Sequence, residues 1–181
     1  AVALDKKTGR TVWKADRTHD FGTDDGDQKK GYATPVVIQA SGRAQLISPA
    51  AKAVLSLDPL TGRELWRVRY PQHSAAARPL FAHGLVYVAS GRGKAELLAI
   101  RPDGQGDVTE THVAWKAFRG VGASPSPVLV NGYVYSVTDK AGVVTCLDAK
   151  TGAEVWQRRV GGVAHTASPL FADGALYFFA E

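Results

Sequence analysis

The chain has 181 residues, of which 22% are charged, and its formal net charge is +5 at pH 7. A mildly basic net charge affects solubility and the attraction of anionic partners, but it does not determine the fold. Nucleic-acid binding would require a basic stripe interleaved with exposed aromatic side chains. Most aromatic residues here fall at core-pattern positions, so no nucleic-acid partner is expected. The sequence contains no apolar run that would span a membrane and no signal peptide, and its one cysteine, Cys146, has no internal disulfide partner.

A short phrase that ends in tryptophan recurs along the chain. It is nearly intact in ALDKKTGRTVW (residues 3–13), SLDPLTGRELW (56–66) and CLDAKTGAEVW (146–156), and residues 99–115 keep its two ends around a longer middle. The four copies end at Trp13, Trp66, Trp115 and Trp156, spaced 41 to 53 residues apart. A period of this length indicates one supersecondary unit that is copied along the chain.

Each copy of the tryptophan phrase predicts two antiparallel strands joined by a tight turn. Its aspartate (Asp5, Asp58 or Asp148) can accept hydrogen bonds from the amides of the turn, and its glycine (Gly9, Gly62 or Gly152) supplies the positive φ that the turn requires. The tryptophan then lies on one face of the outgoing strand. Because an indole buries a large area and needs a hydrogen-bond partner, we expect it to pack between neighbouring units.

A second phrase alternates with the first, at residues 34–48, 78–90, 126–137 and 168–179. Each copy has a proline, an apolar run, a glycine-containing turn and a second apolar run. The dipeptides Asn131-Gly132 and Asp173-Gly174 are strong signals for a two-residue hairpin turn. The proline of each copy is expected at the first residue of its strand, where no ladder amide is lost.

Together the two phrases predict an all-β fold, a β-propeller of four-stranded antiparallel blades. Residues 1–181 form one propeller domain or part of one, with half-blades at 1–16 and 164–181 and whole blades at 32–70, 75–119 and 123–160. Two arrangements are open: the half-blades pair into a fourth blade and close a small ring, or the chain is an arc of a larger ring. We favour the arc, within a seven- or eight-bladed propeller.

The tryptophan phrase resembles the docking motif of the pyrroloquinoline quinone (PQQ)-type repeats, and the alternating SPxxxxGxxY phrase is also typical of that family. The resemblance covers essentially the whole chain. It implies the propeller fold of the quinoprotein alcohol dehydrogenases and of BamB-like envelope proteins, bacterial PQQ-binding-like repeat proteins among them. The dehydrogenases resemble one another in a Cys–Cys disulfide over the cofactor and a Ca²⁺ held by Glu and Asn. This chain has no Cys–Cys pair, and its single asparagine, Asn131, is placed in a hairpin turn.

The segment between the first half-blade and the first whole blade carries four aspartates, Asp20, Asp24, Asp25 and Asp27. These carboxylates could offer oxygens to a hard cation, but they lack the helix–loop–helix calcium spacing. Lys29 and Lys30 follow directly and would offset the negative charge. We expect a solvated loop, with no metal site.

Candidate binding residues fall on one predicted face of the propeller. His73 and His165 both precede an inner strand, a position that lines the mouth of the central channel. Arg78 stands where the other copies of the second phrase have a serine or threonine. The predicted loops 49–53, 90–95 and 138–142 share that face and carry Lys52, Arg92 with Lys94, and Lys140.

A ring of such bases would attract anionic partners at long range. The sequence therefore favours a non-catalytic scaffold that binds a protein or an anionic polymer through this basic loop face, with no cofactor. The resemblance to BamB implies the periplasm or cell envelope, and pairing with a missing half of the propeller is a further expected contact. The alternative is a fragment of a quinoprotein dehydrogenase that uses PQQ and calcium.

Overall fold

Nearly all regular structure in the chain is β-strand. The computed structural model describes residues 1–17, 21–162 and 164–181. Among these residues the one helical element is a single 3-10 turn, η1 (Asp27–Lys29). Within the same residues, no helix has the length and apolar character needed to cross a membrane.

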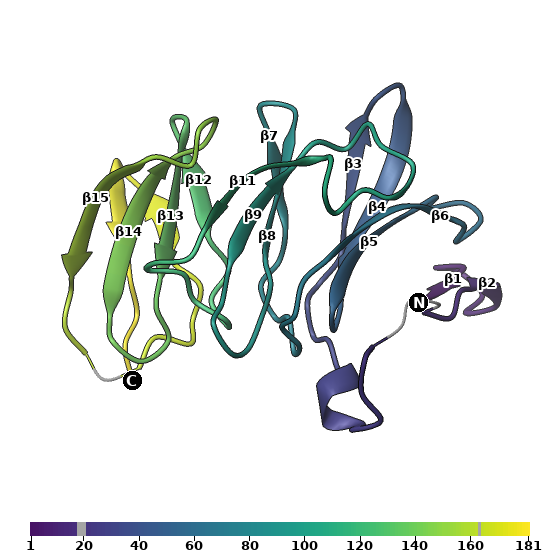
Figure 1. The fold of residues 1–181 in the computed structure, drawn as a ribbon, viewed down its shortest axis with the longest axis horizontal. Coiled ribbons are helices and arrows are strands. Elements are labelled where there is room, and N and C mark those ends of the chain that lie inside the picture. The colour runs from purple at the N-terminus through teal and green to yellow at the C-terminus, as the bar shows by residue number, and fades with distance from the viewer. Residues whose placement is uncertain (18–20, 163) are drawn as a thin grey trace.

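Three four-stranded antiparallel units stand side by side, and each follows the meander order that hairpins of adjacent strands dictate (Figure 1). The first contains β3 (Val36–Ala40), β4 (Arg43–Pro49), β5 (Ala53–Leu57) and β6 (Glu64–Arg69). The second contains β7 (Leu80–Ala82), β8 (Leu85–Ala89), β9 (Leu97–Ile100) and β11 (Val113–Ala117). The third contains β12 (Val128–Val130), β13 (Tyr133–Val137), β14 (Val143–Asp148) and β15 (Glu154–Arg159).

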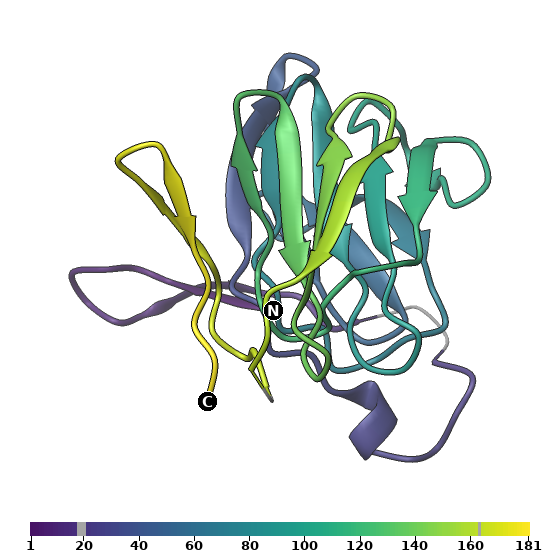
Figure 2. The same cartoon turned by 90° about the vertical axis from the view of Figure 1, so that its left-hand side faces the viewer.

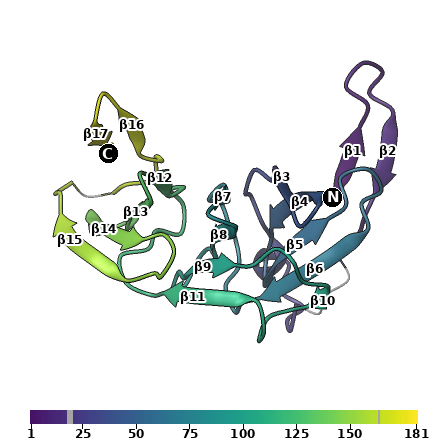
Figure 3. The same ribbon diagram turned by 90° about the horizontal axis from the view of Figure 1, so that it is seen from above.

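Two further hairpins lie at the ends of this row: β1 (Val2–Leu4) with β2 (Thr11–Lys14), and β16 (Leu170–Ala172) with β17 (Ala175–Tyr177). They form separate sheets and do not pair with each other. Seen from above, the units form an open arc with one hairpin at each end (Figure 3). Both hairpins project from the same, concave side of the arc (Figure 2). The arc is the arrangement favoured from the sequence, and the small closed ring is not formed.

The core lies between neighbouring sheets, as expected for a propeller. Val86 and Val88 of β8 face the first unit and pack with Trp66, whereas Tyr87 of the same strand faces the third unit and packs with Leu147. Alternate side chains of a strand point to opposite faces, and both faces of β8 are buried. This accounts for the continuous apolar runs in the sequence, because such a strand needs no polar face.

The prolines of the second phrase lie one residue earlier than expected. Pro35 and Pro127 immediately precede β3 and β12 instead of opening them. A proline in this position limits the backbone before the strand without removing an amide from the ladder.

The stretched third copy of the tryptophan phrase does more than form a longer turn. Its residues Gly106–Asp107 form a short strand, β10, that pairs in parallel with β6 of the preceding unit. Val108 follows and is buried in the core between the two units. The first unit therefore has a five-stranded sheet, and its outer edge is covered by the next unit.

Candidate binding surface

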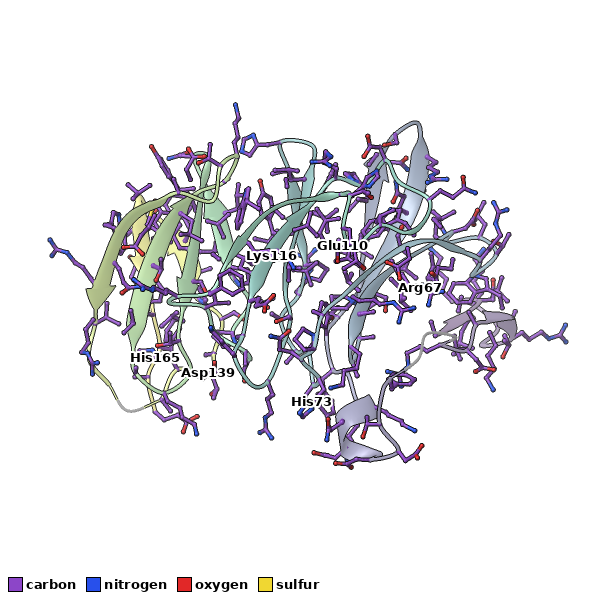
Figure 4. All side chains as sticks on the ribbon, in the orientation of Figure 1. Arg67, His73, Glu110, Lys116, Asp139 and His165 are labelled. Atoms are coloured by element: carbon purple, nitrogen blue, oxygen red, sulfur yellow. The ribbon has the colours of Figure 1, made fainter. Side chains whose placement is uncertain are left out.

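The loops that carry the predicted basic residues other than Arg78 lie along the lower side of the arc in Figure 1, which we call the lower face. They are the connections β4–β5, β8–β9 and β13–β14, together with the segments that lead into β7 and β16. In Figure 4, His73, Asp139 and His165 lie along this side, whereas Arg67, Glu110 and Lys116 lie higher, on the strands. Antiparallel meanders explain the arrangement, since every second connection returns to the same edge of its sheet.

A hollow of about 850 Å³ opens on the lower face between the second and third units and the last hairpin. His73, Arg92 and Lys140 line it. His73 and Arg92 are held together by a backbone bridge in which the Arg92 N–H donates to the His73 carbonyl at 2.7 Å. The side chains of Arg92 and Lys140 are exposed. The structure thus brings together three of the seven predicted residues.

Acidic and hydroxyl side chains also line this hollow, and the sequence analysis did not single them out. They include Asp139, Glu181, Ser124 and Thr166. The Asp139 carboxylate accepts the backbone N–H of Ala123 at 2.6 Å and of Ser124 at 2.9 Å. Glu181 accepts the Thr166 hydroxyl at 2.9 Å. In the sequence, the one sign that Asp139 lies at this hollow is its position directly before Lys140 in the same loop.

Lys52 and Lys94 belong to the same face but do not line the hollow. The Lys52 ammonium donates to the Pro71 carbonyl at 2.8 Å and to Gln28 Oε1 at 3.4 Å, so it links its loop to the segment after β6 and to η1. Its backbone has a φ of 65°, in the left-handed region. Lys94 is exposed, and its ammonium lies 5.6 Å from the ring centroid of Phe118.

His165 is buried, with 2% of its surface exposed. Its Nδ1 lies 3.0 Å from the Phe179 carbonyl oxygen and its Nε2 lies 2.8 Å from that of Gly161. Carbonyl oxygens only accept hydrogen bonds, so the ring joins two backbone segments inside the chain. His165 therefore does not belong to the exposed surface of the lower face.

Arg78 is exposed and lies in a different place, on the concave side of the arc. It lines a hollow of about 750 Å³ along the inner strands, together with Ser126, Ser168 and residues of β3. The Arg78 N–H donates to Ser126 Oγ and the Ser126 N–H donates to Ser168 Oγ, both at 2.9 Å. The Ser126 hydroxyl thus links the third unit to the second, and the Ser168 hydroxyl links the last hairpin to the third unit. Arginine has no acceptor atom. At position 78 a cation therefore stands in place of the hydroxyl acceptor of the other copies.

Asp24, Asp25 and Asp27 are engaged locally near the lower face, and Asp20 lies outside the described residues. Asp25 Oδ1 accepts the Asp27 N–H at 2.9 Å. A hydrogen bond and ion pair with Lys30 at 2.8 Å lower the pKa of Asp27, and the charges of His73 and Arg92 add to this lowering. Asp27 thus partly offsets the positive potential near His73 and Arg92.

Cys146 is buried in β14, opposite Tyr135 of β13. Burial raises the pKa of its thiol above the usual value, with a hydrogen bond from Tyr135 acting in the opposite direction. A thiol with a raised pKa is a weak nucleophile at neutral pH.

The stacked four-stranded units and the core between them define this chain as β-propeller in architecture. It belongs to the family whose model is described as outer membrane protein assembly factor BamB, which matches residues 1–107 and 105–181. A comparison with curated proteins gives no match.

Three solved structures illustrate the similarity. BamB from Moraxella catarrhalis is 22% identical over 94% of this chain and 47% of its own, with a TM-score of 0.58. The quinohemoprotein alcohol dehydrogenase ADHIIG from Pseudomonas putida HK5 is 26% identical over 75% of this chain and 21% of its own, with a TM-score of 0.50. The computationally designed Ika8 protein is 13% identical over 98% of this chain and 48% of its own, with a TM-score of 0.61. The chain thus spans about half the length of BamB or Ika8.

Proposed function

We propose that this chain is part of a non-catalytic propeller scaffold of the bacterial cell envelope, which binds an anionic protein or polymer through the lower face. The observation that carries the proposal is the convergence of His73, Arg92 and Lys140 on one hollow. Membership of the BamB family supports a protein partner and a location in the periplasm or envelope. The division of residues 1–181 into blades of one larger ring is part of the same proposal.

The charges of the hollow favour an anionic partner in spite of its acidic residues. The carboxylates of Asp139 and Glu181 are already acceptors of internal hydrogen bonds. Among the described residues, no ion pair within 4.0 Å engages the side chain of Arg92 or Lys140. These two exposed cations therefore keep their charge available for a partner, with His73 between the loops as a hydrogen-bonding group.

The test is a double charge reversal, Arg92→Glu with Lys140→Glu, measured by titrating the chain with fluorescent poly-L-glutamate. Binding should weaken at least about tenfold, because attraction becomes repulsion at two neighbouring positions. The unfolding free energy should change by less than about 1 kcal/mol, since exposed charges contribute little to stability. Binding by the unaltered chain should also weaken as salt rises above the physiological range, where screening shortens the reach of the charges.

A matched control reverses two exposed cations away from the lower face, Arg63→Glu and Lys116→Glu. This variant has the same net charge as the first, so equal losses in the two variants would show that net charge alone governs binding and would contradict the proposed surface. Poly-L-glutamate binding that is indifferent to both variants and to salt would contradict it as well.

A further inference from the structure

Four equivalent residues form a row along the arc, one at the entry of each inner strand. They are Thr34, Arg78, Ser126 and Ser168, which lie two residues before β3, β7, β12 and β16, and each is followed by a proline. In Figure 3, β3, β7 and β12 lie on the concave side of the arc, whereas β6, β11 and β15 lie on its convex side. The row therefore belongs to the concave side, where neighbouring units approach one another.

Hydrogen bonds link this row from one unit to the next, but only where the next residue is a serine. Arg78 N–H donates to Ser126 Oγ and Ser126 N–H donates to Ser168 Oγ, both at 2.9 Å. Between the first and second units the link is broken, because an arginine side chain has no acceptor atom. In the part of the chain that the structure describes, the backbone N–H of Thr34 has no acceptor.

The Arg78 side chain adds a positive charge at this break. It is exposed on the hollow of about 750 Å³ that inner-strand residues line, and no carboxylate is among the residues that line this hollow. No ion pair within 4.0 Å engages Arg78 among residues 1–17, 21–162 and 164–181. Ser126 Oγ is already an acceptor, so its hydroxyl proton remains available as a further donor. The break between the two units thus combines a cation with hydrogen-bond donors and lacks an acceptor.

We propose that this break is a binding site for an oxyanion, the carboxylate or phosphate group of a ligand. One oxygen of the anion accepts the Thr34 N–H, in the place that Ser126 Oγ takes for the Arg78 N–H one unit further on. The other oxygens accept hydrogen bonds from the guanidinium of Arg78, whose planar fork matches two oxygens of one carboxylate or phosphate group. The anion therefore supplies the acceptor that position 78 lacks and neutralises its charge.

This site is separate from the lower-face hollow of the proposed function. Thr34, Arg78 and Ser126 do not line that hollow, and His73, Arg92 and Lys140 do not line this one. The variant Arg92→Glu with Lys140→Glu should therefore retain oxyanion binding at Arg78. Failure of one site leaves the evidence for the other unchanged.

The first test is calorimetric titration of the unaltered chain with inorganic phosphate and with acetate, at constant ionic strength and with chloride as the reference anion. We expect saturable binding at millimolar concentration or below. Arg78→Ser restores the hydroxyl of the other copies, so this variant should fold and its dissociation constant should be at least about tenfold higher. Arg63→Ser removes the same charge from an exposed turn and is the matched control, which should bind as the unaltered chain does.

Tighter binding of phosphate would support a phosphate-bearing ligand at this site, and tighter binding of acetate a carboxylate-bearing one. Equal binding of chloride, equal losses in Arg78→Ser and Arg63→Ser, or no saturable binding of either oxyanion would overturn the proposal.

The second test observes the backbone amide of Thr34 by nuclear magnetic resonance and needs no substitution. Its chemical shift should change saturably with the anion that binds, and its exchange with solvent should slow, because the N–H gains an acceptor. In Arg78→Ser the same amide should be insensitive to the anion, since the restored hydroxyl already accepts it. A Thr34 amide that does not respond at saturating anion in the unaltered chain would also overturn the proposal.

Discussion

At the scale of single residues, the tryptophan phrase combines a turn and a contact with the next unit. Asp58 Oδ1 accepts the N–H groups of Leu60 and Thr61, which fixes the turn and lowers the pKa of that carboxyl, the bond from Leu60 contributing most. Trp13 and Trp115 donate directly to a carbonyl of the next unit, that of Pro59 and that of Ala149, whereas Trp66 does not. Its Nε1 donates to Gln45 Oε1 at 2.7 Å, and Gln45 Nε2 donates to the Pro102 carbonyl of the next unit at 2.9 Å. A buried glutamine thus extends the indole toward the stretched third copy.

Replacement of Trp66 by alanine should lower the unfolding free energy by about 3–5 kcal/mol, because the ring is fully buried and its loss leaves a cavity. The polar part of the loss can be separated with Trp66→Phe, which keeps most of the ring and removes the bond to Gln45. Chemical denaturation with an unchanged m-value measures both. A loss below about 1 kcal/mol for the alanine variant would contradict a role of this ring in packing.

At the scale of secondary-structure elements, β10 shows how one unit covers the edge of another. The backbone N–H of Val108 donates to the Arg67 carbonyl at 2.9 Å, which continues the pairing of β10 with β6. Arg69 Nε pairs with Asp107 Oδ2 at 2.7 Å, but both side chains are more than 40% exposed, so this ion pair contributes little. The buried side chain of Val108 is the larger contribution to the attachment.

Val108→Ala should therefore cost about 1.5 kcal/mol of unfolding free energy, from the loss of two buried methyl groups. The same change at Val37, which is 56% exposed on β3, is the control and should cost much less. Asp107→Ala should cost less than about 1 kcal/mol. If Asp107→Ala were the more damaging of the two changes in the β10 segment, the ion pair and not the apolar contact would hold β10 in place.

At the scale of the whole molecule, this chain is similar in fold both to BamB and to a quinohemoprotein alcohol dehydrogenase. The fold alone therefore does not decide between a scaffold and part of an enzyme. The residues do differ from the dehydrogenase pattern. The chain has no Cys–Cys pair, Asn131 occupies a hairpin turn at a φ of 49°, and the repeat aspartates are held by their turns.

We accordingly expect no saturable binding of PQQ by this chain. The measurement is tryptophan fluorescence during titration with PQQ in the presence of Ca²⁺, and the unfolded chain under the same conditions reports non-specific quenching. Saturable quenching at micromolar PQQ would favour the dehydrogenase alternative over the scaffold.

The sequence by itself was sufficient for the repeat, the strand content and the propeller architecture. The reason is that these depend on local patterns: a glycine at a positive φ in each turn, an aspartate that accepts turn amides, and alternating apolar runs. Even the absence of contact between the two terminal hairpins agrees with the arc that was favoured from the sequence. The role of the stretched third copy was missed, because the pairing of β10 with β6 joins residues that are about 40 positions apart.

The candidate site depended much more on the tertiary structure. From sequence, seven residues were candidates, since each lay in a loop or strand entry on one predicted face. The three-dimensional arrangement brings His73, Arg92 and Lys140 to one hollow, places Arg78 on the concave side and buries His165. Burial and side-chain direction arise from contacts between units, and a pattern within one unit does not contain them.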